Sequence, residues 1–348
     1  MAPSSPRLRR ALGILACVLA LAGGVVTSHL TLPAPPATSR ASREPLRSAP
    51  PPPLEPVVSL APVLGEPPTV ELGPPLRPFA EPLADGAVID GRTPHRLILF
   101  TFDDGPDIRN TPRLLDMLDE YRIKAVFFLT ASRLRGHTPW QEEHRELAQE
   151  IVRRGHIVGN HTIDHEQLPL LETQAVLEQV DGADAVFREL LGGRTWLVRP
   201  PGGSRSPRVD GLLADRGYTQ VLWNLGTGDF QVRDSAEVLR IFRRVLARRE
   251  REHGDRGGIV LLHDTHEWSV DAFPMIITYL REQNCALLAE DAELYDIVDD
   301  PTFFFAAREE GGPGVIAPPA APSPTVLEER QRALRRVTQQ RCERLATR

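Results

Sequence analysis

The stretch Leu-Ile-Leu-Phe-Thr-Phe-Asp-Asp-Gly-Pro at residues 97–106 decides the fold of this chain. Its first six residues are apolar or favour β-structure and predict a buried strand. The following Gly105-Pro106 predicts the turn that ends it. Asp103 and Asp104 therefore stand at the carboxyl end of a buried strand, where carboxylates are costly unless they are paired or bind a metal. A turn whose two aspartates face water is the alternative that this stretch alone leaves open.

Strand-like runs alternate with helical periodicity between about residues 93 and 305. The strand-like runs lie at 97–102, 124–130, 156–159, 195–199, 219–223, 258–262 and 285–289. The helical runs lie at 112–121, 141–154, 172–191, 207–216, 235–250 and 271–283. This alternation predicts an α/β fold in which a parallel sheet closes into a distorted (β/α)7-type barrel. Reactive side chains are then expected at the carboxyl ends of the strands.

Three further motifs follow predicted strands. His161 and His165 have the His-x-x-x-His spacing that zinc ligands use. Arg199 opens the turn Arg-Pro-Pro-Gly-Gly, and His263 ends the apolar run Leu-Leu-His. Each motif alone fits a structural role. Two histidines and one carboxylate, however, would leave an open coordination position, as catalytic metal sites do, and all four motifs fall at one end of the predicted barrel.

The order and approximate spacing of these motifs resemble those of NodB-like polysaccharide deacetylases, carbohydrate esterase family 4. The resemblance covers about residues 95–290. It implies a metal-dependent hydrolase that removes acetyl groups from N-acetylated amino sugars in a glycan such as peptidoglycan or a chitin-type oligosaccharide. The implied partner is thus an acetylated polysaccharide.

The resemblance also implies a role for each motif residue. The residues that would hold a divalent metal, zinc or alternatively cobalt, nickel or manganese, are Asp104, His161 and His165. Asp103 would be the general base that takes a proton from the attacking water, and Arg199 would orient it and keep it ionised. His263 would be the general acid that protonates the leaving amine.

Two positions depart from the family pattern. Gly202 follows Arg-Pro-Pro, where the family usually has an aromatic residue that walls the sugar site. Gly226 stands where the pattern Asp-x-x-Asp-Trp has its first aspartate, which supports the acid histidine. Asp229 or Asn224 would have to replace that support. Two alternatives therefore stay open: a catalytically impaired, glycan-binding protein of the same fold, and an O-acetyl esterase of the xylan type.

The two ends of the chain have a different composition from the middle. Arg7, Arg9 and Arg10 precede an uncharged run at 11–26, so residues 1–32 are expected to be a cleaved signal peptide or an uncleaved signal-anchor. Residues 33–92 are expected to be a proline-rich, disordered linker. The deacetylase domain is assigned to 93–305, followed at 306–348 by a disordered tail with a second proline-rich linker and a terminal helix.

Export to the cell envelope or the extracellular space follows from this N-terminus, with membrane attachment through it as an open alternative. Past Cys17 the chain has only Cys285 and Cys342, which predicts no disulfide framework. The net charge of −6, with 25% charged residues, argues against a basic nucleic-acid binder. A third interpretation makes the tails the main function, as a tether.

Overall fold

A computed structural model describes residues 86–305 and 314–346. The expected signal segment and nearly all of the N-terminal linker lie outside these ranges. None of the helices within them has the length and apolar content that a membrane span needs.

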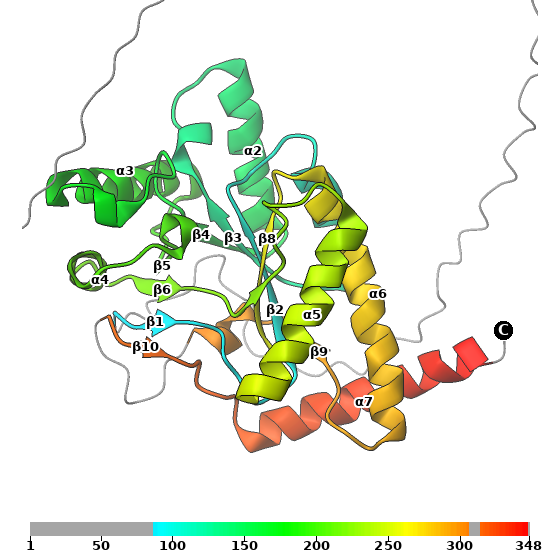
Figure 1. The fold of residues 1–348 in the computed structure, drawn as a ribbon. Coiled ribbons are helices and arrows are strands. Elements are labelled where there is room, and N and C mark those ends of the chain that lie inside the picture. The colour runs from blue at the N-terminus through cyan, green and yellow to red at the C-terminus, as the bar shows by residue number, and fades with distance from the viewer. Residues whose placement is uncertain (1–85, 306–313, 347–348) are drawn as a thin grey trace, which may run out of the picture. The chain divides into compact units, whose positions relative to one another are not determined.

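The ten strands form one sheet in which every strand pairing is parallel. They are β1 (Val88–Ile89), β2 (Leu97–Asp103), β3 (Val126–Leu129), β4 (Ile157–Asn160), β5 (Leu197–Val198), β6 (Thr219–Val221), β7 (Leu225–Gly226), β8 (Gly258–His263), β9 (Asp296–Ile297) and β10 (Ile316–Ala317). Their order is β10-β1-β6-β5-β4-β3-β2-β8-β7, and β9 pairs with β2 beside this path. No pairing joins β7 to β10 among the described residues, so the sheet curls without closing (Figure 1). The predicted distorted barrel is confirmed.

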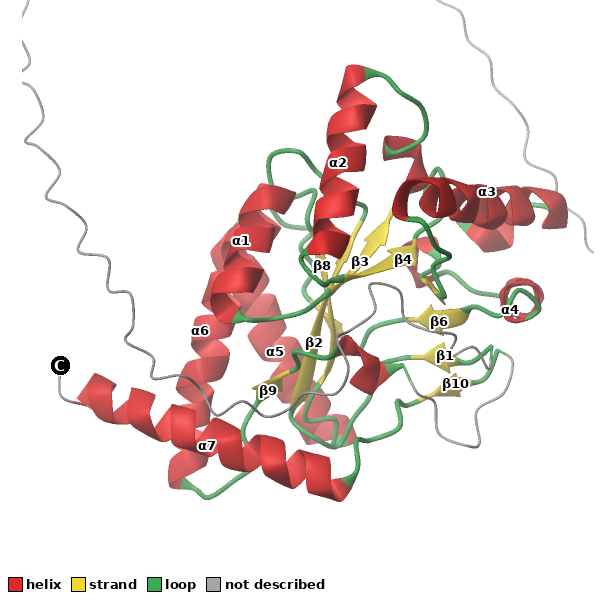
Figure 2. Cartoon of the chain, turned by 180° about the vertical axis from the view of Figure 1, so that it is seen from behind, coloured by secondary structure: helices red, strands yellow, loops and turns green. Residues whose placement is uncertain are grey.

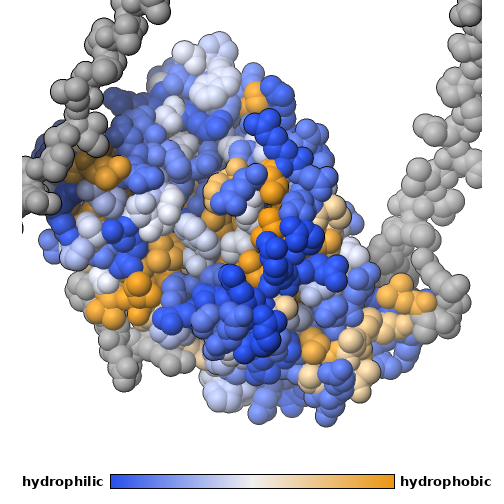
Figure 3. Space-filling view, in the orientation of Figure 1, coloured by the Kyte–Doolittle hydropathy of each residue, from blue (hydrophilic) through white to orange (hydrophobic). Residues whose placement is uncertain are grey.

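Helices follow most strands and cover the outside of the sheet (Figure 1). They are α1 (Thr111–Tyr121), α2 (Pro139–Arg153), α3 (Thr173–Leu191), α4 (Pro207–Ala214), α5 (Ser235–His253), α6 (Glu267–Ala289) and α7 (Pro324–Ala346). In α5, Val238, Phe242 and Leu246 are buried at a four-residue spacing, which turns one helical face to the core. Its arginines and glutamates form the hydrophilic surface over this helix in Figure 3.

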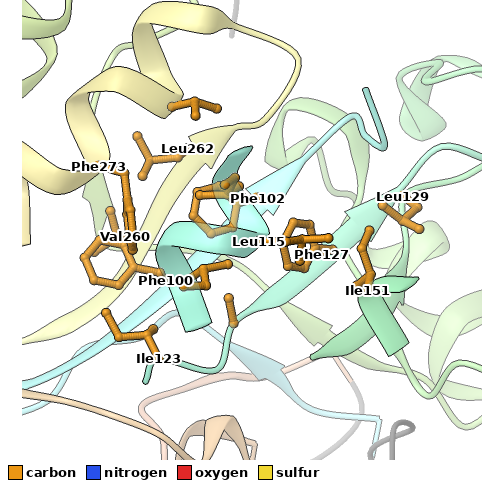
Figure 4. Close-up of a cluster of buried hydrophobic side chains, with 14 of the residues drawn as sticks. Phe100, Phe102, Leu115, Ile123, Phe127, Leu129, Ile151, Val260, Leu262 and Phe273 are labelled. Atoms are coloured by element: carbon orange, nitrogen blue, oxygen red, sulfur yellow. The ribbon is translucent and has the colours of Figure 1, made fainter. Parts of the chain in front are cut away.

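Strand β2 separates two hydrophobic clusters. Phe100 and Phe102 pack outward against α6, where both rings contact Phe273 edge-on (Figure 4). Leu97 and Leu99 belong to the other cluster, together with residues of β3 and β8. Because successive side chains of a strand point to opposite faces, Asp103 shares the side of Leu97 and Leu99. The alternation of side chains along β2 therefore places Asp103, the candidate base, on the inner side of the curled sheet.

The predicted strand at 285–289 is wrong, because these residues form the last turns of α6. The run Cys-Ala-Leu-Leu-Ala is short and apolar, and periodicity alone does not separate a strand from a buried helix segment over such a length. The strand in this part of the chain is instead β9, which follows α6 and pairs with β2.

The C-terminal segment is described from 314 to 346, and it contains the expected terminal helix, α7, rather than an entirely disordered tail. Strand β10 pairs with β1, and α7 packs on α6 and β9 (Figure 2). The two cysteines, which predicted no disulfide framework, form a single disulfide: Cys285 of α6 is bonded to Cys342 of α7. Arg330 of α7 adds ion pairs with Asp296 and Asp299, so the terminal helix is fastened to the domain at two places.

Candidate active site

The carboxyl end of β2 delivers two aspartates with different surroundings. Asp103 is the last residue of the strand, is 3% exposed and lies opposite His263 of β8 in the sheet register. Asp104 leaves the strand with φ of 72°, a left-handed conformation that aspartate tolerates better than most residues. This turn of the backbone directs the Asp104 carboxylate to the loop after β4.

That loop carries the two histidines. The distance from Asp104 Oδ1 to His161 Nε2 is 3.4 Å and to His165 Nε2 3.2 Å. One ligand atom from each of the three residues lies within 4.8 Å of the others. The rings converge because Thr162 and His165 have left-handed backbones, not because they share a helical turn. Asn160 Oδ1 accepts the Thr162 N–H at 2.8 Å and holds this loop in place.

These three residues fit a divalent metal on two observations. Asp104 Oδ1 is buried and has no hydrogen-bond partner among the described residues, as a metal-binding oxygen would. His161 donates its Nδ1–H to the Arg199 carbonyl oxygen at 2.6 Å. That bond fixes the ring tautomer and leaves the Nε2 lone pair free toward Asp104. One carboxylate and two imidazoles suit zinc or another first-row divalent ion.

The charge at the site is consistent with an ionised Asp104. Burial by itself would raise the pKa of this carboxyl, but the adjacent imidazoles, His161 first and then His165 and His263, hold it well below its usual range. Burial lowers the pKa of His165 against the opposing charge of Asp104. A neutral His165 is the form that coordinates metal.

Arg199 lies beneath Asp103 and is fully buried. Its Nη1 donates to Asp103 Oδ1 at 2.6 Å and to Thr101 Oγ1 at 2.8 Å, and its Nε donates to the Val221 carbonyl at 2.8 Å. Its guanidinium lies 4.1 Å from the Phe128 ring centroid. A planar guanidinium held at several points in this way pairs with the Asp103 carboxylate and fixes its orientation.

His263 lies on the other side of the site, at the end of β8. Its Nδ1 donates to Asp229 Oδ1 at 3.0 Å, and its Nε2 lies 3.9 Å from Asp104 Oδ2. Burial by itself would lower the pKa of His263, but the hydrogen bond and charge of Asp229 outweigh it and raise the pKa to about 9. A pKa this high favours the protonated ring, whose Nε2 lies on the side of Asp104.

Asp229 is completely buried and its second oxygen is also occupied. Oδ2 accepts the His263 backbone N–H and the Ser269 hydroxyl, each at 2.7 Å. Burial would raise the pKa of Asp229, but these bonds and the His263 charge lower it. Of the two replacements considered for the acid missing at Gly226, Asp229 is the one that contacts His263. Asn224 instead bonds the Gly257 carbonyl and the Ile259 N–H.

The structure thus brings together the six residues that the sequence predicted. It adds two that sequence reasoning missed, Thr101 and Ser269. Thr101 stands two residues before Asp103 on the same strand face, a signal that was readable; Ser269 has no such signal. Asp264, which follows His263, is also buried, accepts the Thr111 hydroxyl, and has its pKa raised by burial to about 7.

Comparisons with known proteins point to the same family of proteins that the sequence motifs resemble. The model of the family described as polysaccharide deacetylase matches residues 90–221. The peptidoglycan-N-acetylmuramic acid deacetylase PdaC of Bacillus subtilis is 30% identical over 193 residues, which are 56% of this chain and 38% of that protein. The peptidoglycan-N-acetylglucosamine deacetylase PgdA of Listeria monocytogenes is 30% identical over 201 residues, 58% of this chain and 39% of that protein. The chain therefore spans less than half the length of both relatives.

A solved structure gives the same assignment. The chitin deacetylase of the fungal pathogen Colletotrichum lindemuthianum matches with a TM-score of 0.50 and 26% identity, over 57% of this chain and 87% of that chain. Residues 90–221 of this chain thus match the polysaccharide deacetylase family.

Proposed function

We propose that this protein is a metal-dependent polysaccharide deacetylase that acts on N-acetylated amino sugars of a peptidoglycan or chitin-type glycan. The observation that carries the proposal is the arrangement of base, metal candidates and acid around one point: Asp103 on Arg199, the cluster at Asp104, and His263 on Asp229. The peptidoglycan substrates of PdaC and PgdA support the substrate class.

The residues divide the reaction between them. When bound by Asp104, His161 and His165, a divalent cation would lower the pKa of water and polarise the acetyl carbonyl. Asp103, held ionised by Arg199, accepts the proton of the attacking water. His263 gives its Nε2 proton to the amide nitrogen as the carbon–nitrogen bond breaks. A carbon–oxygen bond to the water oxygen replaces it, so the products are acetate and the free amine.

The alternative of a non-catalytic glycan-binding protein rested on the missing acid at Gly226. Asp229 removes that reason, because His263 has a buried carboxylate partner without it. A protonated His263 also favours the N-acetyl over the O-acetyl substrate, since an amine leaves poorly unless it is protonated.

We also propose that the protein works outside the cytoplasm, in the cell envelope or beyond it. The disulfide between Cys285 and Cys342 supports this location, because such bonds form and persist mainly in oxidising compartments. The expected signal peptide or signal-anchor at 1–32 agrees with it.

The full-length protein should release acetate from N-acetylchitooligosaccharides or peptidoglycan. A chelator should abolish the release, and adding back zinc, cobalt, nickel and manganese one at a time should identify the metal that restores it. Asp103→Asn should lose acetate release and keep its metal content, whereas Asp116→Asn on the surface of α1 should keep both. Wild-type turnover by Asp103→Asn would remove the base assignment. Glycan binding without acetate in every metal and at every pH would support the binding-protein alternative.

A further inference from the structure

The indole of Trp223 lies against two glycines. One is Gly203, the second glycine of the Pro-Pro-Gly-Gly turn, and the other is Gly226, which departs from the family pattern. Trp223 belongs to the connection between β6 and β7. A Cβ atom at Gly203 would lie 2.9 Å from the six-membered ring of Trp223, closer than side chains pack, and one at Gly226 would lie 3.4 Å from its Nε1. The glycines therefore leave the space that the indole fills.

The same indole lies beside the base. The Arg199 guanidinium carbon is 5.5 Å from the Trp223 ring centroid, and that guanidinium holds Asp103. Trp223 is half-buried and packs against the cluster that contains Leu97 and Leu99, so part of the residue is exposed. One side chain thus separates this aromatic surface from the proposed base.

The position that usually carries the aromatic wall is open in this chain. A Cβ at Gly202 would meet only Ser204 Oγ within 4 Å, at 3.8 Å. The backbone there has φ of 61°, which side chains rarely adopt. An apolar surface for the sugar on this side of the site must therefore come from another element.

We propose that Trp223 is the sugar-contacting wall of the site and a residue that determines its specificity. The accessible part of the indole packs on the apolar C–H face of the pyranose ring whose acetamido group lies at Asp103 and Asp104, and Nε1–H donates to a hydroxyl of the sugar. The inference rests on the proposed deacetylase function, since it names the surface that orients the substrate of that site.

Kinetics of acetate release from N-acetylchitotetraose test the wall. Trp223→Ala should raise KM about tenfold, with kcat changed less than KM, and Trp223→Phe should recover most of the loss because it keeps a ring. Trp140→Ala, at an exposed tryptophan of α2, is the matched control and should keep the wild-type KM. A wild-type KM for a folded Trp223→Ala protein would overturn the proposal.

A second measurement does not depend on turnover or on the alanine variant being folded. Asp103→Asn protein is titrated with N-acetylchitotetraose while its tryptophan fluorescence is recorded, with and without Trp223→Phe. A fluorescence change on adding the glycan that is lost in Trp223→Phe but retained in Trp140→Phe supports the wall. This result would support it even if the wild-type protein releases no acetate and the proposed function fails. A signal that survives Trp223→Phe, or a glycan that gives none, overturns it.

Discussion

Replacing Asp229 with asparagine changes the acid side of the proposed reaction while keeping the shape of the side chain. The Asp229 carboxylate accepts from the His263 ring at 3.0 Å and from its backbone N–H at 2.7 Å. Asparagine retains the packing and one accepting oxygen but loses the negative charge. The hydrogen bond and the charge of Asp229 together are the main reason that a buried imidazole stays protonated here.

The size of the effect follows from the pKa of His263. With Asp229 present this pKa is about 9, so about nine in ten rings are protonated at pH 8. Without the charge, burial acts with less opposition and the pKa falls from about 9 toward the ordinary 6.5, and at that limit about 3% of the rings are protonated at pH 8. We expect kcat of Asp229→Asn to be lower than that of wild type by up to about thirtyfold at pH 8 and within about twofold of it at pH 5.5.

The assay is the rate of acetate release with saturating glycan from pH 5 to 9.5. Asp271→Asn, an exposed acid on α6, is the control and should follow the wild-type curve. Thermal unfolding of each protein shows whether the fold is retained. A folded Asp229→Asn protein whose curve overlays that of wild type would refute the assignment of His263 as an acid supported by Asp229.

Three further changes test other parts of the structure. Burial lowers the pKa of His156 to about 3, so acidification from about pH 6.5 toward 3 costs the folded state about 4 kcal/mol; His156→Gln should lose less stability over this range in denaturant titrations. Cys285→Ser frees Cys342 and opens a link across 57 residues, which should lower the free energy of unfolding by up to about 4 kcal/mol; urea unfolding of wild type with and without reductant should show the same difference. Arg199→Lys cannot hold Asp103 and its other partners together, and kcat should fall at least about a hundredfold in the acetate assay with metal content unchanged.

The elements predicted well are those whose signals are local. Strand β2 is recognisable because seven consecutive buried residues end at Asp103 and a Gly-Pro turn follows. The start of α4 was predicted for the same reason: the helical run at 207–216 begins where the helix does, and the Ser206 side chain caps it. The 285–289 run failed because a short apolar segment has no local feature that separates helix from strand.

By itself the sequence determined which residues end the strands, because strand period and turn residues are properties of neighbouring positions. Parallel strands then bring those ends to one edge, so Asp104, His161 and His165 were predictable as a group. Only the tertiary structure decided that Asp229 faces His263, and that Cys285 meets Cys342. These contacts join positions 34 and 57 residues apart, and their geometry depends on how whole elements pack, which no local pattern records.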